Sequence, residues 1–183
     1  MAPSGQVDAP ALQALLQDAA LTGNWTLDGS RSTVRLQSKS MWGMVTVKGV
    51  FGQASGQGTV TPAGEVSGTL TVHAASIDTK NKKRDTHLRS ADFFDSDTYP
   101  DITFTVDRAS PSGQGVTVSG SLTVRDRTRP VTFDAQVSLI SAGEMSLDAE
   151  VQVDRSEFGL AWNRLGMASM HNTIIVRAVF TRR

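Results

Sequence analysis

The chain has 183 residues, 18 Lys and Arg against 18 Asp and Glu, 39% hydrophobic residues and no Cys. This composition is typical of a one-domain globular protein, which at this length buries about 70% of its unfolded surface without disulfide or metal staples. A formal net charge of +0 disfavours a generic nucleic-acid binder, because affinity for the phosphate backbone comes from an excess of Lys and Arg. The missing thiols exclude Cys-based catalysis and Cys-containing zinc sites.

The first segment of the chain has a helical pattern. Asp8 is a candidate N-cap, Pro10 stands in the first turn, and leucines recur at helical spacing, which predicts a helix over Asp8–Leu21. Its single apolar stripe predicts packing on the outside or across one end of another structure. We therefore treat residues 1–23 as an N-terminal helical extension of a main domain formed by residues 24–183.

The same segment lacks the features of a secretory signal. Met1 to Gly23 contains no Lys or Arg, and its Leu run is interrupted by Gln13, Gln17 and Asp18. No stretch of the chain approaches the roughly 18 uninterrupted apolar residues of a membrane span. We therefore expect a cytoplasmic protein that holds any lipid partner and does not cross a membrane.

After Trp25 the hydrophobic period changes from helical spacing to the strict alternation of half-buried strands. Apolar residues alternate with Thr, Ser and charged residues, and turns that contain Pro or Gly separate the runs. The predicted strands cover residues 33–37, 44–51, 56–61, 66–74, 102–107, 116–125, 131–139, 144–153 and 174–180. Strands joined by such turns are antiparallel, and their shared apolar face must be hidden in a sandwich or a closed barrel.

Two stretches interrupt this alternation of apolar and polar residues. Residues 78–97 contain a charged helical turn followed by two adjacent Phe residues, and they form a long loop of the kind that is often functional. In the helical turn, Asp85 and Arg89 stand four positions apart, a spacing that allows an ion pair. Residues 155–170 are interrupted by Gly and carry large flexible apolar side chains.

The predicted inward positions of the six clearest strands contain no charged, His, Ser or Thr side chain. A catalytic pocket needs convergent polar groups, so this interior favours either a packed core or a cavity for an apolar molecule. Periodicity alone leaves both alternatives open. The three His residues lack metal-ligand spacing, and no Gly-x-Ser-x-Gly elbow is present, so neither a metal site nor a hydrolase is indicated.

Several short motifs follow one another in a fixed order through the chain. They are the stretches 77–79, 84–95, 99–104, 120–124 and 128–133, with the sequences IDT, RDTHLRSADFFD, YPDITF, GSLTV and TRPVTF. Together they resemble the YceI-like family of lipocalin-like, polyisoprenoid-binding proteins, and the likeness extends from Trp25 to about Phe180. The resemblance implies an all-β fold, an extended eight-stranded antiparallel barrel with the N-terminal helix and a helical insertion after the fourth strand.

The resemblance also implies a function for residues 24–183. The barrel would hold a polyisoprenoid, an isoprenoid quinone or a related long-chain lipid in an apolar cavity, without chemical transformation and without a cofactor. The candidate lining residues, chosen from the apolar pattern, are Trp42, Phe51, Leu70, Val72, Phe94, Phe104, Leu122, Phe133, Phe158, Trp162, Met167 and Met170. Arg84, Asp85, His87 and Arg89 match the family motif, and we expect them to brace the insertion or bind a head group.

Two other functions stay open at this point. An enzyme acting on a lipid-like substrate would use His87, Asp85 or Asp92 as its acid or base at the cavity mouth. A barrel with a filled core would instead serve as a protein-interaction module. The helix over Asp8–Leu21 would plug one barrel end, form a homodimer contact or dock a partner.

Overall fold

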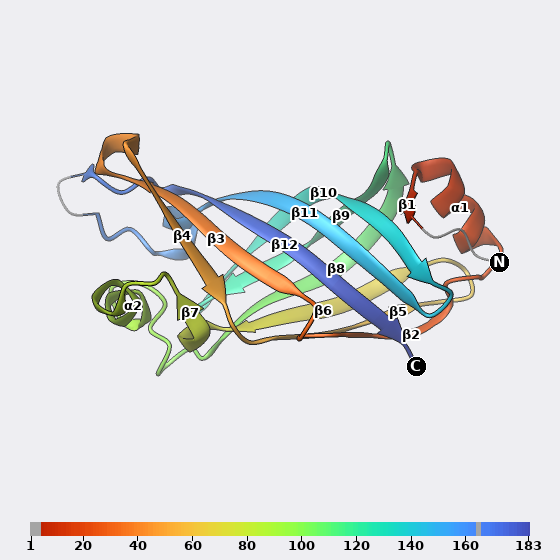
Figure 1. The fold of residues 1–183 in the computed structure, drawn as a ribbon, viewed down its shortest axis with the longest axis horizontal. Helices are drawn as coiled ribbons and strands as arrows, with labels where there is room; N and C mark the ends of the chain where they lie inside the picture. The colour runs from red at the N-terminus through yellow and green to blue at the C-terminus, as the bar shows by residue number, and fades with distance from the viewer. Residues whose placement is uncertain (1–4, 164–165) are drawn as a thin grey trace.

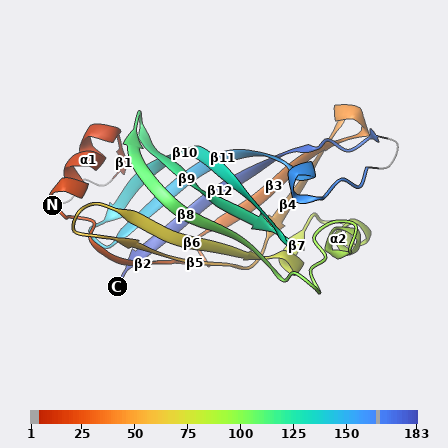
Figure 2. The same ribbon diagram turned by 180° about the vertical axis from the view of Figure 1, so that it is seen from behind.

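The computed structural model describes residues 5–163 and 166–183, which form an elongated antiparallel β-barrel with one helix at each end (Figures 1 and 2). The strands are β1 (Gly5–Val7), β2 (Gly23–Leu27), β3 (Thr33–Ser40), β4 (Val45–Phe51), β5 (Ala54–Val60), β6 (Val66–His73), β7 (Ile77–Asp78), β8 (Asp101–Ser112), β9 (Gly115–Val124), β10 (Arg127–Ser141), β11 (Glu144–Asp154) and β12 (His171–Arg182). The α-helices are α1 (Ala9–Gln17) and α2 (Lys82–Arg89), and the 3₁₀ turns are η1 (Met41–Gly43), η2 (Ala74–Ser76) and η3 (Arg155–Phe158).

The barrel closes through β12, which pairs with β11 on one side and with both β2 and β3 on the other. The ring runs β2-β5-β6-β8-β9-β10-β11-β12, and β3 and β4 continue the walls begun by β2 and β5. The predicted eight-stranded antiparallel barrel is therefore confirmed, and the inserted helix α2 follows β6 and β7. Closure hides the apolar face that the strands share.

Strand alternation determines which side chains enter the barrel. In β9, every second residue from Val116 to Val124 is buried, while the Thr and Ser residues between them are half-buried on the outer face. Gly120 in this strand is needed for close approach to β8: a Cβ at this position would lie 2.7 Å from Cζ of Phe104 and against the carbonyl oxygen of Thr105. The glycine therefore leaves room for an aromatic ring on the inner wall.

The first helix is shorter than its pattern predicts. It starts after the expected N-cap, where the Asp8 carboxylate accepts a hydrogen bond from the Ala11 amide at 3.0 Å, but it ends at Gln17. Ala19 adopts φ 56°, and the amides of Ala19 and Ala20 donate to the carbonyls of Leu16 and Leu15. This left-handed C-terminal turn is usually formed by Gly, so Ala19 does not mark a helix end that the sequence pattern could predict.

Other differences concern short or irregular strands. The two- and three-residue strands β7 and β1, and β2 before Asp28, are too short for a clear alternating pattern. Strand β8 runs past the predicted end at residue 107, through a register shift between Val106 and Arg108, as far as Ser112.

Within the described parts of the chain, no helix is long and apolar enough to cross a membrane.

Candidate functional site

A cavity of about 750 Å³ extends through the barrel from α1 to α2. This volume falls within the range of roughly 300–1,000 Å³ that is typical of small-molecule sites. Its walls are the inward residues of the strands, among them Val34, Leu36, Leu70, Val72, Ile102, Phe104, Val106, Val118, Leu122, Val131, Phe133, Leu147, Val151, Ile174 and Val176. The barrel interior is therefore a lined cavity and not a filled core.

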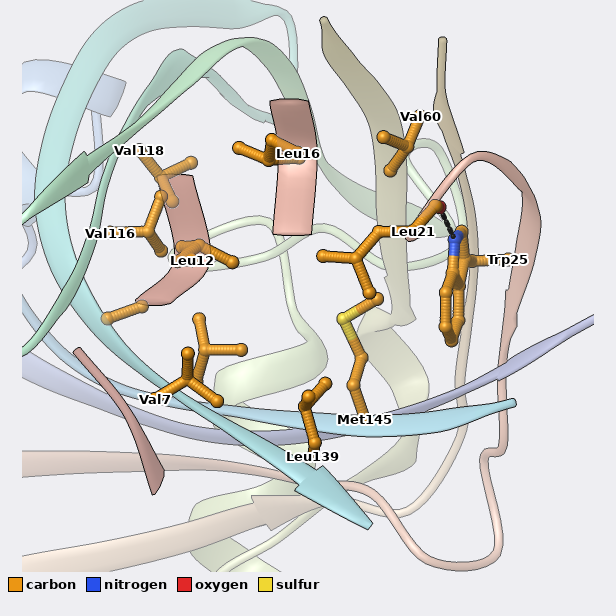
Figure 3. Packing of buried hydrophobic residues seen from close by; sticks show 12 residues of the cluster. Val7, Leu12, Leu16, Leu21, Trp25, Val60, Val116, Val118, Leu139 and Met145 are labelled. Atoms are coloured by element: carbon orange, nitrogen blue, oxygen red, sulfur yellow. Dashed lines mark hydrogen bonds between the residues drawn. The ribbon is translucent and has the colours of Figure 1, made fainter. Parts of the chain in front are cut away.

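Helix α1 closes one end of this cavity. Its buried residues Leu12 and Leu16 face inward beside Leu21, Trp25 and Val60 (Figure 3). The Trp25 indole Nε1 donates a hydrogen bond to the Leu21 carbonyl at 3.0 Å, so its polar atom is satisfied within this apolar cluster.

The helix is anchored to the barrel by two contacts at its N-terminal end. The Ala9 amide donates to the Gly113 carbonyl of the β8–β9 turn at 3.0 Å. Strand β1 just before the helix pairs with β10, with Val7 opposite Val137. The start of α1 is therefore tied both to the β8–β9 hairpin and to the edge of β10.

The opposite end of the cavity is polar and opens to solvent. It is lined by Ser38, Lys39, Ser40, Thr79, Asn81, Lys83, Arg84, His87, Arg155 and Asn172. Lys39 and Lys83 are exposed, which shows that the cavity reaches the surface here. Five of these side chains are basic or His, and no Asp or Glu occurs among the cavity-lining residues that the structure describes. The charged side chains that line this cavity mouth are therefore all basic, although the net charge of the protein is zero.

Along β5 and β6 the cavity wall includes Gly58 and Gly68, which face each other across the strand pair. The neighbouring side chains of Gln57, Thr59 and Ser67 are exposed on the outside of the barrel. The wall is thin there because neither glycine adds a side chain to its inner face.

Helix α2 is held over the mouth by side-chain hydrogen bonds to the β7 region. The buried Asp85 carboxylate accepts from the Thr79 amide at 2.9 Å and from the Thr79 hydroxyl at 2.5 Å. The Arg84 guanidinium donates to the Thr79 hydroxyl and carbonyl, both at 2.8 Å. Arg89 donates to the carbonyls of Ala75 and Ile77 and does not form the pair with Asp85 that helical spacing allows. Thr79, and not Arg89, is therefore the donor to the Asp85 carboxylate.

His87 is the fourth residue of the motif and is the one that faces aromatic rings at the mouth. Its Nε2 lies 2.9 Å from the Asp92 carboxylate. Its ring packs edge-to-face on Trp162 and on Phe93, with distances between ring centroids of 4.4 Å and 5.2 Å. This cluster joins α2 to the segment after η3. Within residues 5–163 and 166–183, no group of three or more His, Asp or Glu is placed to hold a metal ion.

The buried Arg155 side chain holds the segment after η3 in place by hydrogen bonds to its backbone. Its side chain is 7% exposed and donates to the carbonyls of Ser169 at 3.0 Å, Leu160 at 2.6 Å and Trp162 at 2.8 Å. Desolvation by burial lowers the pKa of the Arg155 guanidinium, and the carbonyl oxygens offset part of that cost. Sequence reasoning missed this residue, because a single Arg after a strand carries no local sign of burial.

The structure brings most of the predicted lining residues together. Phe51, Leu70, Val72, Phe94, Phe104, Leu122, Phe133, Phe158 and Trp162 all line the cavity. Trp42 does not: it lies on η1 at the tip of the β3–β4 hairpin, 66% exposed, because Met41 and Trp42 adopt φ near 50° and break the strand alternation. Met167 and Met170 are half-buried beside the mouth, where their carbonyls accept from the amides of Trp42 and Arg155.

The comparisons with known proteins agree with this architecture. Residues 25–181 match the family model of the YceI-like domain. A UPF0312 protein of Staphylococcus aureus (strain USA300) is 33% identical over 150 residues, which cover 77% of this chain and 84% of that protein.

Two solved structures share the fold. BcnA of Burkholderia cenocepacia superposes with a TM-score of 0.73 at 27% identity, over 84% of this chain and 98% of that one. A polyisoprenoid binding domain from Saccharophagus degradans, implicated in plant cell wall breakdown, superposes with a TM-score of 0.69 over 87% of this chain and 98% of its own. Its identity is 18%, so this likeness shows the fold alone. Because the family match spans the whole barrel, from β2 to the end of β12, the chain belongs to the YceI-like family.

Proposed function

We propose that this protein binds a long apolar molecule of the polyisoprenoid class inside its barrel and carries it without chemical change. The observation that supports the proposal is the 750 Å³ cavity, whose walls along the barrel are aliphatic and aromatic. Burial of each ligand CH₂ in such a cavity contributes about 0.8 kcal/mol. The Saccharophagus degradans neighbour, described as a polyisoprenoid binding domain, supports the same class of ligand.

The two ends of the cavity support one orientation of the ligand. The apolar tail extends toward Leu12 and Leu16 of α1, where no polar partner is needed. A polar head group stays at the mouth, within the region lined by Lys39, Lys83 and Arg84. A head group placed at the α1 end would lose its hydration without gaining hydrogen bonds.

The geometry gives less support to an enzyme. Asp85 is committed to Thr79, so its carboxylate braces the fold. His87 and Asp92 form a pair at the mouth, but their ring and carboxylate contacts join α2 to neighbouring segments. Binding and carriage therefore account for more of the site than acid–base chemistry does.

Uptake of geranylgeraniol and of a long-chain ubiquinone tests the proposal. We expect native mass spectrometry of the full chain to show one bound lipid per protein, recovered unchanged by solvent extraction. Leu70→Trp places an indole on the inner wall opposite Phe104, and it should abolish uptake at a folding cost of about 1–3 kcal/mol.

Thr71→Trp is the matched control, because it adds the same side chain to the next residue of β6, on the outer face. This variant should bind lipid like the unmodified protein. A protein that takes up neither lipid, or equal uptake by Leu70→Trp and the unmodified chain, would contradict the proposal.

A further inference from the structure

Exposed large apolar side chains are concentrated at the tip of the β3–β4 hairpin. Met41, Trp42 and Val45 are exposed, and Met44 is the most exposed of them at 77%. The tip consists of η1, Met44 and the first residue of β4, and it projects from the α2 end of the barrel, on the far side of the molecule from α1 (Figure 1). We refer to residues 41–45 as the apolar tip.

The apolar tip has a defined shape. Met41, Trp42 and Gly43 adopt φ of 51°, 53° and 90° in succession, and left-handed backbone at two non-glycine residues costs free energy that neighbouring contacts must offset. The Trp42 amide donates to the Met167 carbonyl at 3.2 Å, and the Ser169 amide donates to the Lys39 carbonyl at 2.9 Å. The hairpin is thus fixed by the segment that Arg155 holds in place, and the Trp42 indole is exposed.

The apolar tip adjoins the cavity mouth. The three residues just before it, Ser38, Lys39 and Ser40, line the cavity, and the exposed Trp162 lines it from the neighbouring segment. A surface that covered the tip would therefore also cover the only polar end of the cavity found in the described structure.

The charged residues of the hairpin that carries the tip are all basic. Residues 33–51 contain Arg35, Lys39 and Lys48 and no Asp or Glu. The basic residues Lys83 and Arg84 of α2 line the same mouth. An exposed Trp among flexible apolar side chains with basic neighbours matches the interface of a bilayer that contains anionic lipids.

We propose that the apolar tip inserts into the surface of an anionic bilayer and places the cavity mouth against it, so that the ligand moves between bilayer and cavity without crossing water. This inference rests on the proposed lipid-carrying function. It adds the partner, a membrane surface, and the end of the barrel through which exchange occurs.

Flotation with vesicles tests the inference. Vesicles of phosphatidylcholine mixed with phosphatidylglycerol should carry the full chain upward, and added salt or pure phosphatidylcholine should weaken this binding. A Trp42→Ser/Met44→Ser double variant should bind at least about tenfold more weakly, because it removes the inserted apolar surface. Lys39→Gln should weaken binding to the anionic vesicles about fivefold and leave binding to neutral vesicles unchanged.

Ile140→Ser is the matched control. Ile140 is 42% exposed and lies near the end of β10, next to the residues that pair with β1 at the α1 end of the barrel. It should float like the unmodified protein. The double variant should still take up geranylgeraniol added from solution, but it should extract ubiquinone from vesicles more slowly.

The outcomes separate this inference from the proposed function. A protein that takes up geranylgeraniol from solution and floats with neither kind of vesicle overturns the membrane inference alone. A protein that takes up no lipid by any route overturns the proposed function. Sedimentation velocity gives the third arm: self-association that the double variant abolishes, without vesicle binding, assigns the tip to a second copy of the chain and overturns the membrane inference.

Discussion

The two ends of this barrel differ in how they satisfy their buried groups. At the α1 end, apolar side chains pack on apolar side chains, and the one indole N–H finds a carbonyl four residues away. At the α2 end, Asp85, Arg84 and Arg155 are satisfied by hydrogen bonds to Thr79 and to backbone carbonyls. One end is therefore an apolar packed closure and the other an opening braced by hydrogen bonds.

Substitutions at the closed end should lower the free energy of unfolding the most. Leu12→Ala with Leu16→Ala removes two buried side chains from the plug, and each large-to-small change in a core costs about 2–5 kcal/mol. Because both face a cavity, we expect the lower part of that range for each. Urea unfolding should show the loss, whereas Gln13→Ala on the exposed face of α1 should leave the free energy of unfolding within about 0.5 kcal/mol. Equal stability of the two variants would show that α1 is not a structural closure.

Substitutions at the braced opening should lower the free energy of unfolding by a smaller amount. Asp85→Ala leaves the buried Thr79 amide without its acceptor, which costs about 1–3 kcal/mol. We also expect faster amide hydrogen exchange across α2, because the contact of Asp85 with Thr79 is one of its attachments to the β7 region. Asp97→Ala, at an exposed position of the same insertion, serves as the control. A variant whose α2 exchanges as slowly as in the unmodified protein would argue against this bracing role.

The smallest effect is expected at the junction between the two ends, where β2 gives way to β3. Hydrogen bonds from Ser30 and Arg31 hold the pKa of Asp28 at about 2, below its ordinary value of 3.8. A lowered acid pKa means that the folded state binds fewer protons than the unfolded state as the pH falls. The stabilisation is therefore complete above about pH 4 and is lost as the pH falls toward 2.

Asp28→Asn tests this junction. The variant should be less stable than the unmodified protein at neutral pH, and the difference should shrink between pH 4 and pH 2 in thermal unfolding followed by circular dichroism. Asp107→Asn, at an exposed position of β8, should show no such convergence. A difference that stays constant across this pH range would refute the assigned role of the Asp28 carboxylate.

The same division separates what the sequence could predict from what it could not. Period-two alternation identifies residues such as Leu70, Phe104 and Leu122 as inward, because each strand's faces are fixed by local geometry. The mouth is built from segments without a period. Trp42 was wrongly predicted to line the cavity because its direction depends on left-handed backbone and on a hydrogen bond to Met167, far away in the chain.

The resemblance and the structure together also limit how far motifs can be interpreted. Arg84, Asp85 and Arg89 belong to the family motif, and their hydrogen bonds brace the insertion. Arg155 makes more hydrogen bonds than any of them, yet no local pattern marked it. Burial of a charged group is decided by which distant carbonyls converge on it, and that information is absent from spacing along the chain.

The position of α1 has a consequence for ligand selection. Since Leu12 and Leu16 form the end wall of the cavity, the depth available to a tail is set by how far these two side chains reach inward. Under the proposed function, larger side chains at these positions would shorten the accepted ligand chain, and smaller ones would lengthen it, with the barrel wall unchanged. Relatives with the same strands and different plugs would sort lipids of one chemistry by length.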